Sequence, residues 1–399
     1  MIPSVTDIYA QKNYFNETSF ALLMRKRIYQ ILLISSVYDA FMLEEDGRID
    51  EQIFYEYMSL NLRFPPRFIL ATSKKEAMET LEEESINLVI CMLSAEEKET
   101  INLTAQIKDI YPDIPIVVLT PFSMEVSIRL ESTEFKSYDY LFSWLGNADL
   151  LLAVIKFIED KMNVEHDVEA VGVQTIILVE DNIRFYSSYL PNMYKIIFKQ
   201  SKSFMREGLN EHQKMIRARG RPKILLATNF EEALSLYEKY RENLLGIISD
   251  INYMRAGVRD KFAGFKLAEI IKKDSSLTPI LLQSSEPDNR QRAKKMKVGF
   301  LDKNSPKLTY ELREFIKQYF AFGDFVFVCP DTGEAVERAG SLRELQEKIF
   351  QIPENSLRYH IERDHISKWL RARALFSISS LFKSFSPDDF ENSYQIKQF

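Results

Sequence analysis

The stretch PRFILATSKKEAM at residues 66–78 recurs further along the chain as PKILLATNFEEAL at residues 222–234. Each copy has an apolar run that ends in Ala-Thr, then a Ser or Asn that can cap a helix, then Glu-Ala at the start of an amphipathic pattern. A strand that leads directly into a capped helix is half of a βαβ unit. The repeat therefore predicts two copies of one α/β domain.

Three further pairs of short apolar runs accompany the two copies in matching order. Each run is continuous and rich in β-branched residues, which is typical of a parallel strand buried on both faces. The pairs are Ile31–Ser36 with Ile176–Asp181, Leu88–Met92 with Gly246–Asp250, and Pro115–Thr120 with Pro279–Ser284. Because helical patterns alternate with these runs, we expect two α/β domains, each a doubly wound sheet of parallel strands.

These patterns divide the chain into four segments. They are an N-terminal arm at 1–27, a first α/β domain at 28–162, a second at 174–320, and a small α+β module of a hairpin and helices at 323–399. The polar stretch Lys161–Gln174 is the expected linker between the two α/β domains.

Both α/β domains have an unusually long stretch after their first strand, Val37–Pro65 and Ile183–Arg221. We expect a helical insertion in each, and at about 1.5 Å per residue the second would project beyond its domain. Two interpretations stay open for it: packing on the neighbouring domain, or a homodimer interface. The basic residues near its end are expected to form a solvated face: Lys214, Arg217, Arg219, Arg221 and Lys223.

Composition excludes several classes of protein. The 399 residues carry 52 Lys and Arg against 58 Asp and Glu, and a net charge of −6 gives no reason to expect a nucleic-acid partner. Two cysteines exclude a disulfide framework and indicate a reducing compartment. No apolar run reaches the ~18 residues of a membrane helix, and the start lacks a signal pattern. We therefore expect a cytoplasmic protein with no membrane partner.

The C-terminal region has the pattern of a hairpin followed by helices. Phe325–Cys329 and Glu334–Arg338 flank a Pro-Asp-Thr-Gly turn. Ser341 followed by Glu344 predicts a capped helix, and a longer helix is expected from Asn355 onward.

Two histidines, His360 and His365, lie on this longer expected helix. Five residues of helix rotate by about 140°, so the pair would not share a face as a zinc pair does. Tyr359 and Trp369 are expected in the core. An anion or partner surface stays open because several arginines surround these aromatic residues: Arg358, Arg363, Arg371 and Arg373.

Five polar residues stand at the ends of expected strands in the second domain. Glu180 and Asp181 end the first strand, Asp250 the third, Ser284 the fourth and Lys303 the fifth. Because the carboxyl ends of parallel strands meet at one edge of a sheet, we expect the five side chains to converge on one pocket.

Three acidic groups in one pocket repel one another, and a hard divalent cation is their natural compensation. The three carboxylates and the backbone carbonyl of Asn252 are the expected ligands of Mg²⁺. Asp250 would then accept a phosphoryl group as a nucleophile, while Lys303 offsets the developing charge. Ser284 would bind a phosphoryl oxygen and pass its movement to the following loop.

In this order the residues resemble the receiver domain of two-component response regulators, which has a flavodoxin-like fold. The resemblance implies an acidic pair at Glu180 and Asp181, a phosphoacceptor at Asp250, a switch hydroxyl at Ser284, a lysine at Lys303 and a switch aromatic residue at Phe300. It implies a signalling protein rather than an enzyme. A histidine kinase or another donor would phosphorylate Asp250 in a Mg²⁺-dependent step, which would switch protein–protein or interdomain contacts.

One departure from the family lies in the loop after Asp250, residues 252–265, which is longer than usual. Its two arginines, Arg255 and Arg259, would cover the site or select the phosphoryl donor.

The first domain lacks the site. Its corresponding positions hold Ser35, Ser36, Met92 and Ser143, and only Thr120 is retained at the switch position. Met92 cannot accept a phosphoryl group, and nothing at these positions would hold Mg²⁺. We therefore interpret the first domain as a pseudo-receiver that serves packing and interaction.

A wider resemblance covers residues 174–376, which look like the N-terminal regulatory part of bacterial phosphoenolpyruvate synthase-like proteins. It implies that the chain regulates such an activity, with a downstream catalytic domain as its partner.

Two other functions are considered. The first is a phosphorylation-independent interaction scaffold built from two inert receiver folds. The second is a haloacid dehalogenase-like hydrolase, which also uses an aspartate nucleophile. That class needs a second acid two residues later, where this chain has Asn252.

Overall fold

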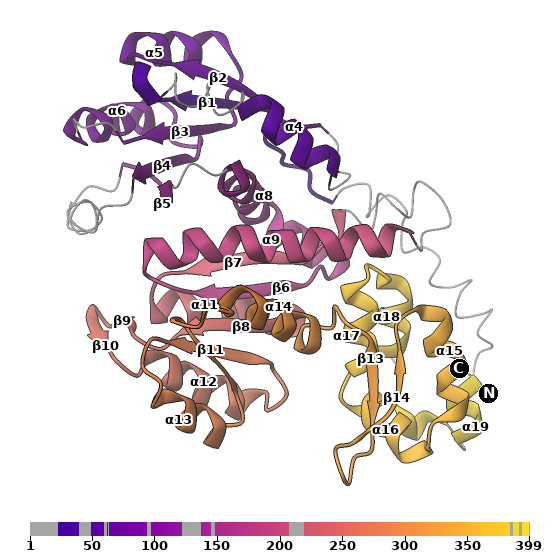
Figure 1. Ribbon diagram of the computed structural model, residues 1–399. Coiled ribbons are helices and arrows are strands. Elements are labelled where there is room, and N and C mark those ends of the chain that lie inside the picture. The colour runs from indigo at the N-terminus through magenta and orange to yellow at the C-terminus, as the bar shows by residue number, and fades with distance from the viewer. Residues whose placement is uncertain are drawn as a thin grey trace. The chain divides into compact units, whose positions relative to one another are not determined.

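The computed structural model describes most of the chain (Figure 1). The described residues are 23–39, 49–59, 62, 64–93, 97–121, 137–144, 148–206, 219–383, 386–390 and 393–398. The expected N-terminal arm lies outside them, apart from its last residues. Contacts divide the chain into two compact units, one with Met24–Met162 and Glu180–Lys202, the other with Asn163–Val179 and Ser203–Phe399.

The first sheet has five parallel strands in the order β2-β1-β3-β4-β5. The strands are β1 (Gln30–Ile34), β2 (Arg67–Ala71), β3 (Leu88–Met92), β4 (Ile116–Pro121) and β5 (Tyr140–Trp144). The helices along this part of the chain are α4 (Ile49–Ser59), α5 (Lys74–Glu83), α6 (Glu97–Ile110) and α8 (Ala148–Val171). This strand order is the flavodoxin-like form of a doubly wound sheet.

The second sheet repeats this order as β7-β6-β8-β11-β12, again with parallel neighbours. The strands are β6 (Thr175–Val179), β7 (Lys223–Ala227), β8 (Leu244–Asp250), β11 (Ile280–Ser284) and β12 (Gly299–Asp302). The helices are α9 (Ile183–Arg206), α11 (Phe230–Tyr240), α12 (Ala263–Asp274), α13 (Asn289–Lys295) and α14 (Leu308–Tyr319). The prediction of two doubly wound parallel sheets is confirmed.

The repeated motif makes the same helix cap in both sheets. Ser73 accepts a hydrogen bond from the backbone N–H of Glu76 at 3.3 Å, and the Glu76 carboxylate accepts from the N–H of Thr72 at 2.8 Å. In the second copy Asn229 and Glu232 make the equivalent contacts at 2.9 and 2.8 Å. The bond from Thr72 holds the pKa of Glu76 below its ordinary value. Each strand is thus followed at once by a fixed helix start.

Helix α8 passes through the stretch that was expected as a linker. It continues to Val171, so most of Lys161–Gln174 is helical. The reason lies in Val164 and Val168, which are one helical turn apart and pack on the core of the second sheet. Although α8 and α9 have 24 residues each, no helix in the described ranges is long and apolar enough to cross a membrane.

Helix α9 packs against the edge strand and the last helix of the first sheet's unit. The Ser187 hydroxyl accepts from the N–H of Ser143 on β5 at 2.9 Å, and the Tyr194 hydroxyl donates to Asp160 on α8 at 2.8 Å. The hydrogen bond from Ser143 to Ser187 satisfies a backbone N–H of β5 that would otherwise be unpaired at the edge of the sheet. It favours the packing interpretation of the insertion, whose residues 207–218 lie outside the described ranges.

Two of the five basic residues that were expected on a solvated face, Arg221 and Lys223, are instead buried, and Arg219 is half-buried. The Lys223 ammonium lies 2.9 Å from the Asp167 carboxylate on α8. Both side chains of this ion pair are fully buried. Because an unpaired buried charge is strongly destabilising, Lys223 and Asp167 depend on each other. Lys214 and Arg217 lie outside the described residues.

The C-terminal module opens with the predicted hairpin, β13 (Phe325–Val328) antiparallel to β14 (Ala335–Ala339). Helix α15 (Leu342–Gln351) begins at Ser341, which accepts from the N–H of Glu344 as predicted. Two short elements end the chain, η2 (Pro387–Asp389) and α19 (Ser393–Gln398).

The single long helix expected after Asn355 is wrong. The segment forms α16 (Glu354–Glu362), α17 (His365–Ala372) and α18 (Phe376–Lys383). The chain turns at Asp364 and Ala374, whose φ angles of 56° and 55° are left-handed and cannot continue a helix. Of the surrounding side chains, Arg373 donates to two backbone carbonyls at 2.9 Å, and Trp369 is buried as expected.

The turn at Asp364 also overturns the expectation that the two histidines stay apart. The Nδ1 atoms of His360 and His365 lie 2.9 Å from each other, and His360 Nε2 accepts from the N–H of Val328 on β13 at 3.0 Å. An accepting Nε2 places the His360 proton on Nδ1, from which it is donated to His365. Burial lowers the pKa of His360 to about 3 and that of His365 to about 4.

We expect the module to lose stability as the pH falls from about 6.5 toward 4. Both folded-state pKa values lie below the ordinary value of 6.5, so the unfolded chain binds more protons in this window and acid favours unfolding. Thermal unfolding at about pH 7.5 and pH 5 measures the effect. A variant with both His360→Gln and His365→Gln should lose part of this pH dependence. An unchanged dependence would contradict the assignment.

Candidate functional site

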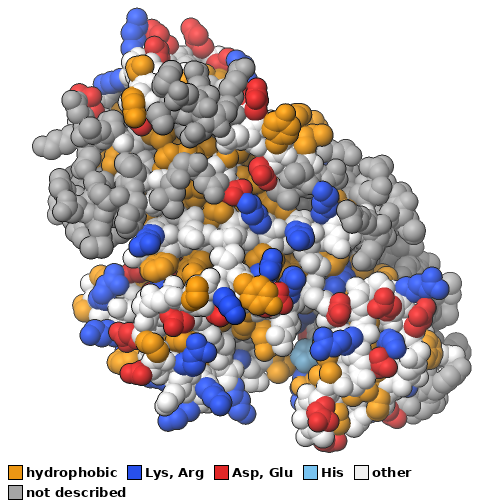
Figure 2. Space-filling model, viewed as in Figure 1, with side chains coloured by type: hydrophobic (Ala, Val, Ile, Leu, Met, Phe, Trp, Pro, Cys, Tyr) orange, Lys and Arg blue, Asp and Glu red, His pale blue; other side chains and the backbone are white. Residues whose placement is uncertain are grey.

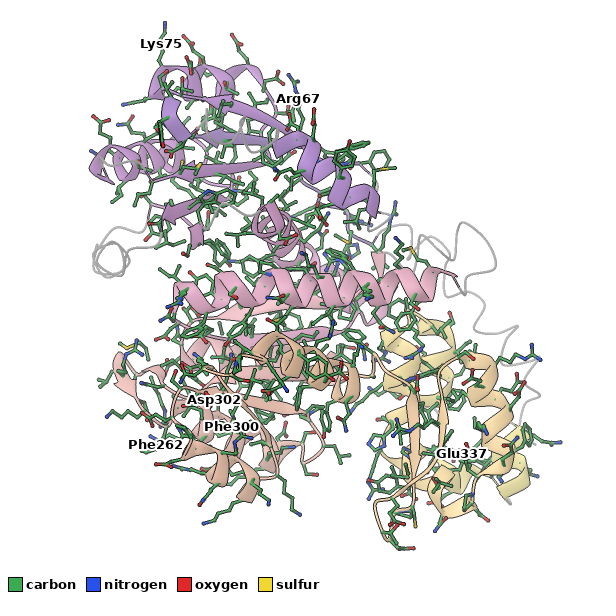
Figure 3. The ribbon with its side chains drawn as sticks, in the orientation of Figure 1. Arg67, Lys75, Phe262, Phe300, Asp302 and Glu337 are labelled. Carbon is green, nitrogen blue, oxygen red and sulfur yellow. The ribbon has the colours of Figure 1, made fainter. Side chains whose placement is uncertain are left out.

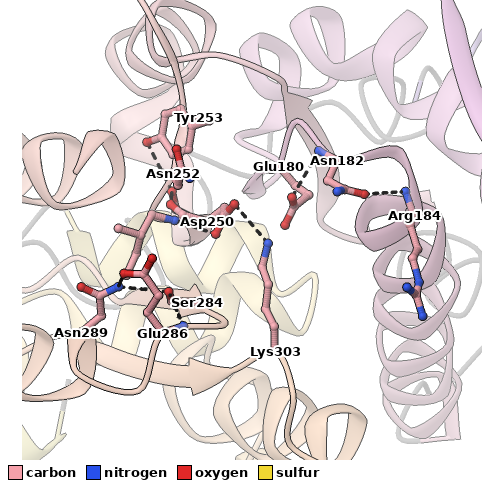
Figure 4. A network of polar contacts seen from close by, with 12 residues as sticks. Glu180, Asn182, Arg184, Asp250, Asn252, Tyr253, Ser284, Glu286, Asn289 and Lys303 are labelled. Carbon is pink, nitrogen blue, oxygen red and sulfur yellow. Dashed lines mark hydrogen bonds and ion pairs between the residues drawn. The ribbon is translucent and has the colours of Figure 1, made fainter. Parts of the chain in front are cut away.

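The carboxyl ends of four parallel strands bring the predicted residues to one edge of the second sheet. The register pairs Val179 with Ser249, Gln283 with Asp250, and Ser284 with Asp302. Glu180 and Asp181 follow β6 directly, Asp250 and Ser284 end β8 and β11, and Lys303 follows β12. Figure 4 shows Glu180, Asp250, Ser284 and Lys303 at this edge.

Three carboxylates form the acidic part of the site. Glu180, Asp181 and Asp250 each offer an oxygen, and these oxygens lie within 4.8 Å of one another. Glu180 is fully buried. Within the described ranges, this is the one group of three or more Asp, Glu, His or Cys side chains that could hold a metal ion. Negative charges this close require compensation by cations.

Lys303 provides one such cation. Its ammonium nitrogen lies 3.1 Å from Oδ2 of Asp250, and the lysine side chain is only 4% exposed. Oδ1 of Asp250 accepts a hydrogen bond from the N–H of Ile251 at 2.8 Å. Both oxygens of the carboxylate therefore have a contact that fixes its orientation (Figure 4).

Ser284 lies at the same edge and holds the start of the next loop. Its hydroxyl oxygen accepts from the N–H of Glu286 and from the side-chain amide of Asn289, both at 3.0 Å. Because both contacts use the oxygen as acceptor, the hydroxyl proton remains to be donated to a ligand.

Phe300 lies on β12, two residues before Asp302 (Figure 3). It is half-buried, and the guanidinium of Arg290 lies 5.1 Å from the centre of its ring. Lys and Arg side chains gather over α13 on the face seen in Figure 2. Helix α13 itself contains Arg290, Arg292, Lys294 and Lys295.

The long loop after Asp250 contains a hairpin that sequence analysis missed, β9 (Tyr253–Arg255) with β10 (Val258–Asp260). Arg259 donates to the backbone carbonyl of Asn252 at 3.1 Å. Arg255 instead stacks on Phe230, 4.7 Å from its ring centre, and lies 3.7 Å from Asp260. Only Arg259 therefore contacts a predicted ligand of the site.

Gly264 also fixes the site, and sequence analysis missed it. A Cβ atom at this position would lie 2.2 Å from the carbonyl oxygen of Asp250. Sequence analysis placed Gly264 in the long loop, whereas the structure places it in the first turn of α12, where glycine is unfavourable unless packing requires it. The absence of a side chain lets α12 approach the backbone of the predicted phosphoacceptor.

The corresponding edge of the first sheet carries different chemistry. Met92 ends β3, Thr120 is buried on β4, and the N–H of Ser143 is bound to Ser187 on α9. Ser36 donates to Asp39 at 2.7 Å, while Ser35 is buried. The predicted positions thus offer hydroxyls and a thioether rather than a group of carboxylates.

The donor set of the second sheet suits a hard divalent cation. Three carboxylates and the carbonyl of Asn252 are all oxygen ligands, which Mg²⁺ prefers. The side-chain oxygen of Asn252 is buried without a hydrogen-bond partner, which leaves an additional polar atom nearby to be satisfied by water or an ion.

Comparison with known proteins gives little further information. No protein-family model and no curated protein matches the chain. Among solved structures, a protein described as a two-component system response regulator/GGDEF domain protein matches 72% of this chain and 98% of its own, with 11% identity and a TM-score of 0.29. A second protein of that description covers 72% and 96%, with 12% identity and a TM-score of 0.28. These scores are too low to carry a conclusion.

Gly264→Ala should weaken Mg²⁺ binding and lower the thermal midpoint, because the added methyl must displace the Asp250 carbonyl. Overpacking of this kind costs about 1–3 kcal/mol. Calorimetric titration with Mg²⁺ measures the affinity. Gly333→Ala is the control: its φ of 73° brings strain of about 1–2 kcal/mol, but its Cβ meets open space far from the site. Wild-type Mg²⁺ affinity in Gly264→Ala would refute the prediction.

Proposed function

We propose that the chain is a receiver-type signalling protein that accepts a phosphoryl group on Asp250 in a Mg²⁺-dependent step. The observation that carries the proposal is the set of side chains at one sheet edge. Three carboxylates lie within 4.8 Å of one another, and a buried lysine pairs with the one that would react. Structural ion pairs do not require such an excess of negative charge.

Asp250 is the nucleophile in this proposal. One of its oxygens forms a bond to phosphorus while the bond from phosphorus to the donor's leaving atom breaks, and the electron pair departs with the leaving group. The donor is a phosphohistidine of a kinase or another activated phosphoryl compound. Lys303, already in contact with Asp250, stays beside the transferred group and offsets its charge.

Glu180, Asp181, Asp250 and the carbonyl of Asn252 would hold the Mg²⁺ ion. The bound ion supplies charge stabilisation for the phosphoryl oxygens. The burial of Glu180 keeps one of these carboxylates away from competing solvent.

Ser284 connects the reaction with a structural change. To donate its proton to a phosphoryl oxygen, the hydroxyl turns toward Asp250, and its two contacts with Glu286 and Asn289 weaken. These contacts hold the loop before α13, so the loop and the basic surface of α13 respond to phosphorylation. The neighbouring Phe300 and its Arg290 partner move with them. The output is a change in protein–protein or interdomain contacts.

The proposal does not assign catalytic turnover to the chain. Its partners are a phosphoryl donor, such as a histidine kinase, and a protein that recognises the switched surface. Regulation of a phosphoenolpyruvate synthase-like activity rests on the sequence resemblance of residues 174–376 and stays a prediction, as does homodimer formation.

The first sheet favours a second role, that of an inert interaction scaffold. Its strand ends carry Met92 and serines where the second sheet carries acids, and its edge strand β5 is covered by α9. This sheet then serves packing, while the second sheet receives the signal.

Asp250→Asn should abolish Mg²⁺-dependent binding of beryllofluoride, a mimic of the phosphoryl group. The amide neither bonds beryllium nor contributes a charge to the metal site. Fluorine NMR of the full chain detects the bound form. Solution mass with and without beryllofluoride would show whether a dimer forms.

Asp302→Asn is the matched control, since this acid ends the neighbouring strand β12 but is not in the acidic group. It should bind the mimic as the wild type does. An absence of binding in the wild type would overturn the proposed function and leave the scaffold.

A further inference from the structure

The β9–β10 hairpin is a fixed arm beside the site. Its two-residue turn places Ala256 and Gly257 at φ angles of 50° and 75°, the left-handed pair that matches the twist of a tight hairpin. The N–H of Ala256 donates to the carboxylate of Glu231 on α11 at 2.9 Å. Arg255 stacks on Phe230 of the same helix. The tip and first strand are thus attached to the start of α11.

The second strand of the hairpin is attached to α12. Asp260 accepts from the ammonium of Lys266 at 2.6 Å and from the N–H of Phe262 at 3.0 Å. The base is anchored by Tyr253, which is fully buried with its hydroxyl 3.4 Å from that of Ser249. Contacts on both strands give the hairpin a defined position relative to Asp250.

This position brings Arg259 to one of the predicted ligands of the site. Arg259 lies opposite Met254 in the hairpin, whereas Arg255 points to the other face and pairs with Asp260. The Arg259 guanidinium donates to the carbonyl oxygen of Asn252 at 3.1 Å. That carbonyl belongs to the second residue after Asp250 and is one of the four groups that would hold Mg²⁺.

Two cations cannot both bind this oxygen closely. A guanidinium at hydrogen-bond distance and a divalent cation at about 2.1 Å would share one carbonyl, and their charges repel. Mg²⁺ also requires near-octahedral geometry and tolerates a displaced ligand poorly. In the metal-free site, by contrast, the positive charge of Arg259 offsets part of the charge of the carboxylates.

We propose that Arg259 is a resident cation that competes with Mg²⁺ for the Asn252 carbonyl and thereby sets the metal affinity of the site. The inference rests on the proposed function, because it assumes that Mg²⁺ binds there. Binding of the ion displaces the guanidinium, so occupancy of the site is coupled to the position of this side chain. The arm that carries Arg259 stays attached through its other contacts.

The test is calorimetric titration of the full chain with Mg²⁺ alone. Arg259→Ala should lower the dissociation constant about fivefold, the effect of removing one competing hydrogen bond. Arg259 is exposed, so the variant is expected to fold, and its thermal midpoint without Mg²⁺ checks this. In the wild type, the NMR signal of the Arg259 Nε–H should shift on addition of Mg²⁺.

Three comparisons make the outcome decisive. Arg343→Ala removes the same charge from an exposed helix pair in the C-terminal module and should leave Mg²⁺ affinity unchanged. If the wild type binds Mg²⁺, Asp250→Asn loses it, and Arg259→Ala binds no more tightly, only this inference is overturned. If neither the wild type nor Arg259→Ala binds Mg²⁺, the proposed function fails with it.

Discussion

Repulsion among three carboxylates is the constraint on which the second sheet's site depends. Parallel pairing of β6 with β8 sets Val179 opposite Ser249, so the next residues, Glu180 and Asp250, lie side by side. Neither can move away without breaking the pairing of two buried strands. Compensation must therefore come from cations, and one of them is Lys303, held by the register of β11 with β12. The strand pairing that builds the core thus brings the carboxylates together and also places Lys303 where it offsets part of their charge.

The first sheet shows that the fold does not need these charges. It has the same strand order and the same capped helix after its second strand, yet Met92 stands where Asp250 stands in the second sheet. Apolar burial and helix capping suffice to form the sheet in both copies. The architecture of the second sheet therefore does not require the acids, whose mutual repulsion opposes their close approach. Local departures from the most stable arrangement are expected at functional sites, which is why the acids favour a function there.

The sheets and strand ends were predictable from sequence because they follow from local patterns. A buried parallel strand is mostly apolar, so Asp250 and Ser284 stand out among the polar residues that close such runs. The helix break at Asp364 was not predictable in this way. Aspartate is only mildly unfavourable in a helix, and the turn is stabilised by tertiary contacts such as the bond from Val328 to His360.

The burial of charged residues was also not predictable from the sequence. Lys223 begins a strand and has the pattern of a surface residue, but its partner Asp167 lies on a helix far away along the chain. The β9–β10 hairpin was missed because its turn is Ala-Gly rather than the more typical Asn-Gly, and its strands have only three residues each. In each case the deciding interaction is between residues that no local pattern connects.

Formal charges show why the number of cations at the site matters. Three carboxylates and Lys303 leave a sum of −2, which one divalent cation balances. With a divalent cation bound, Arg259 as a further cation would bring the total to +1, consistent with competition between the guanidinium and the metal. Transfer of a phosphoryl group replaces one carboxylate by an acyl phosphate of charge about −2, so the site gains about one negative charge. Before transfer, the positive charge of the Arg259 guanidinium opposes binding of the metal. After transfer, the same positive charge would balance the additional negative charge of the acyl phosphate.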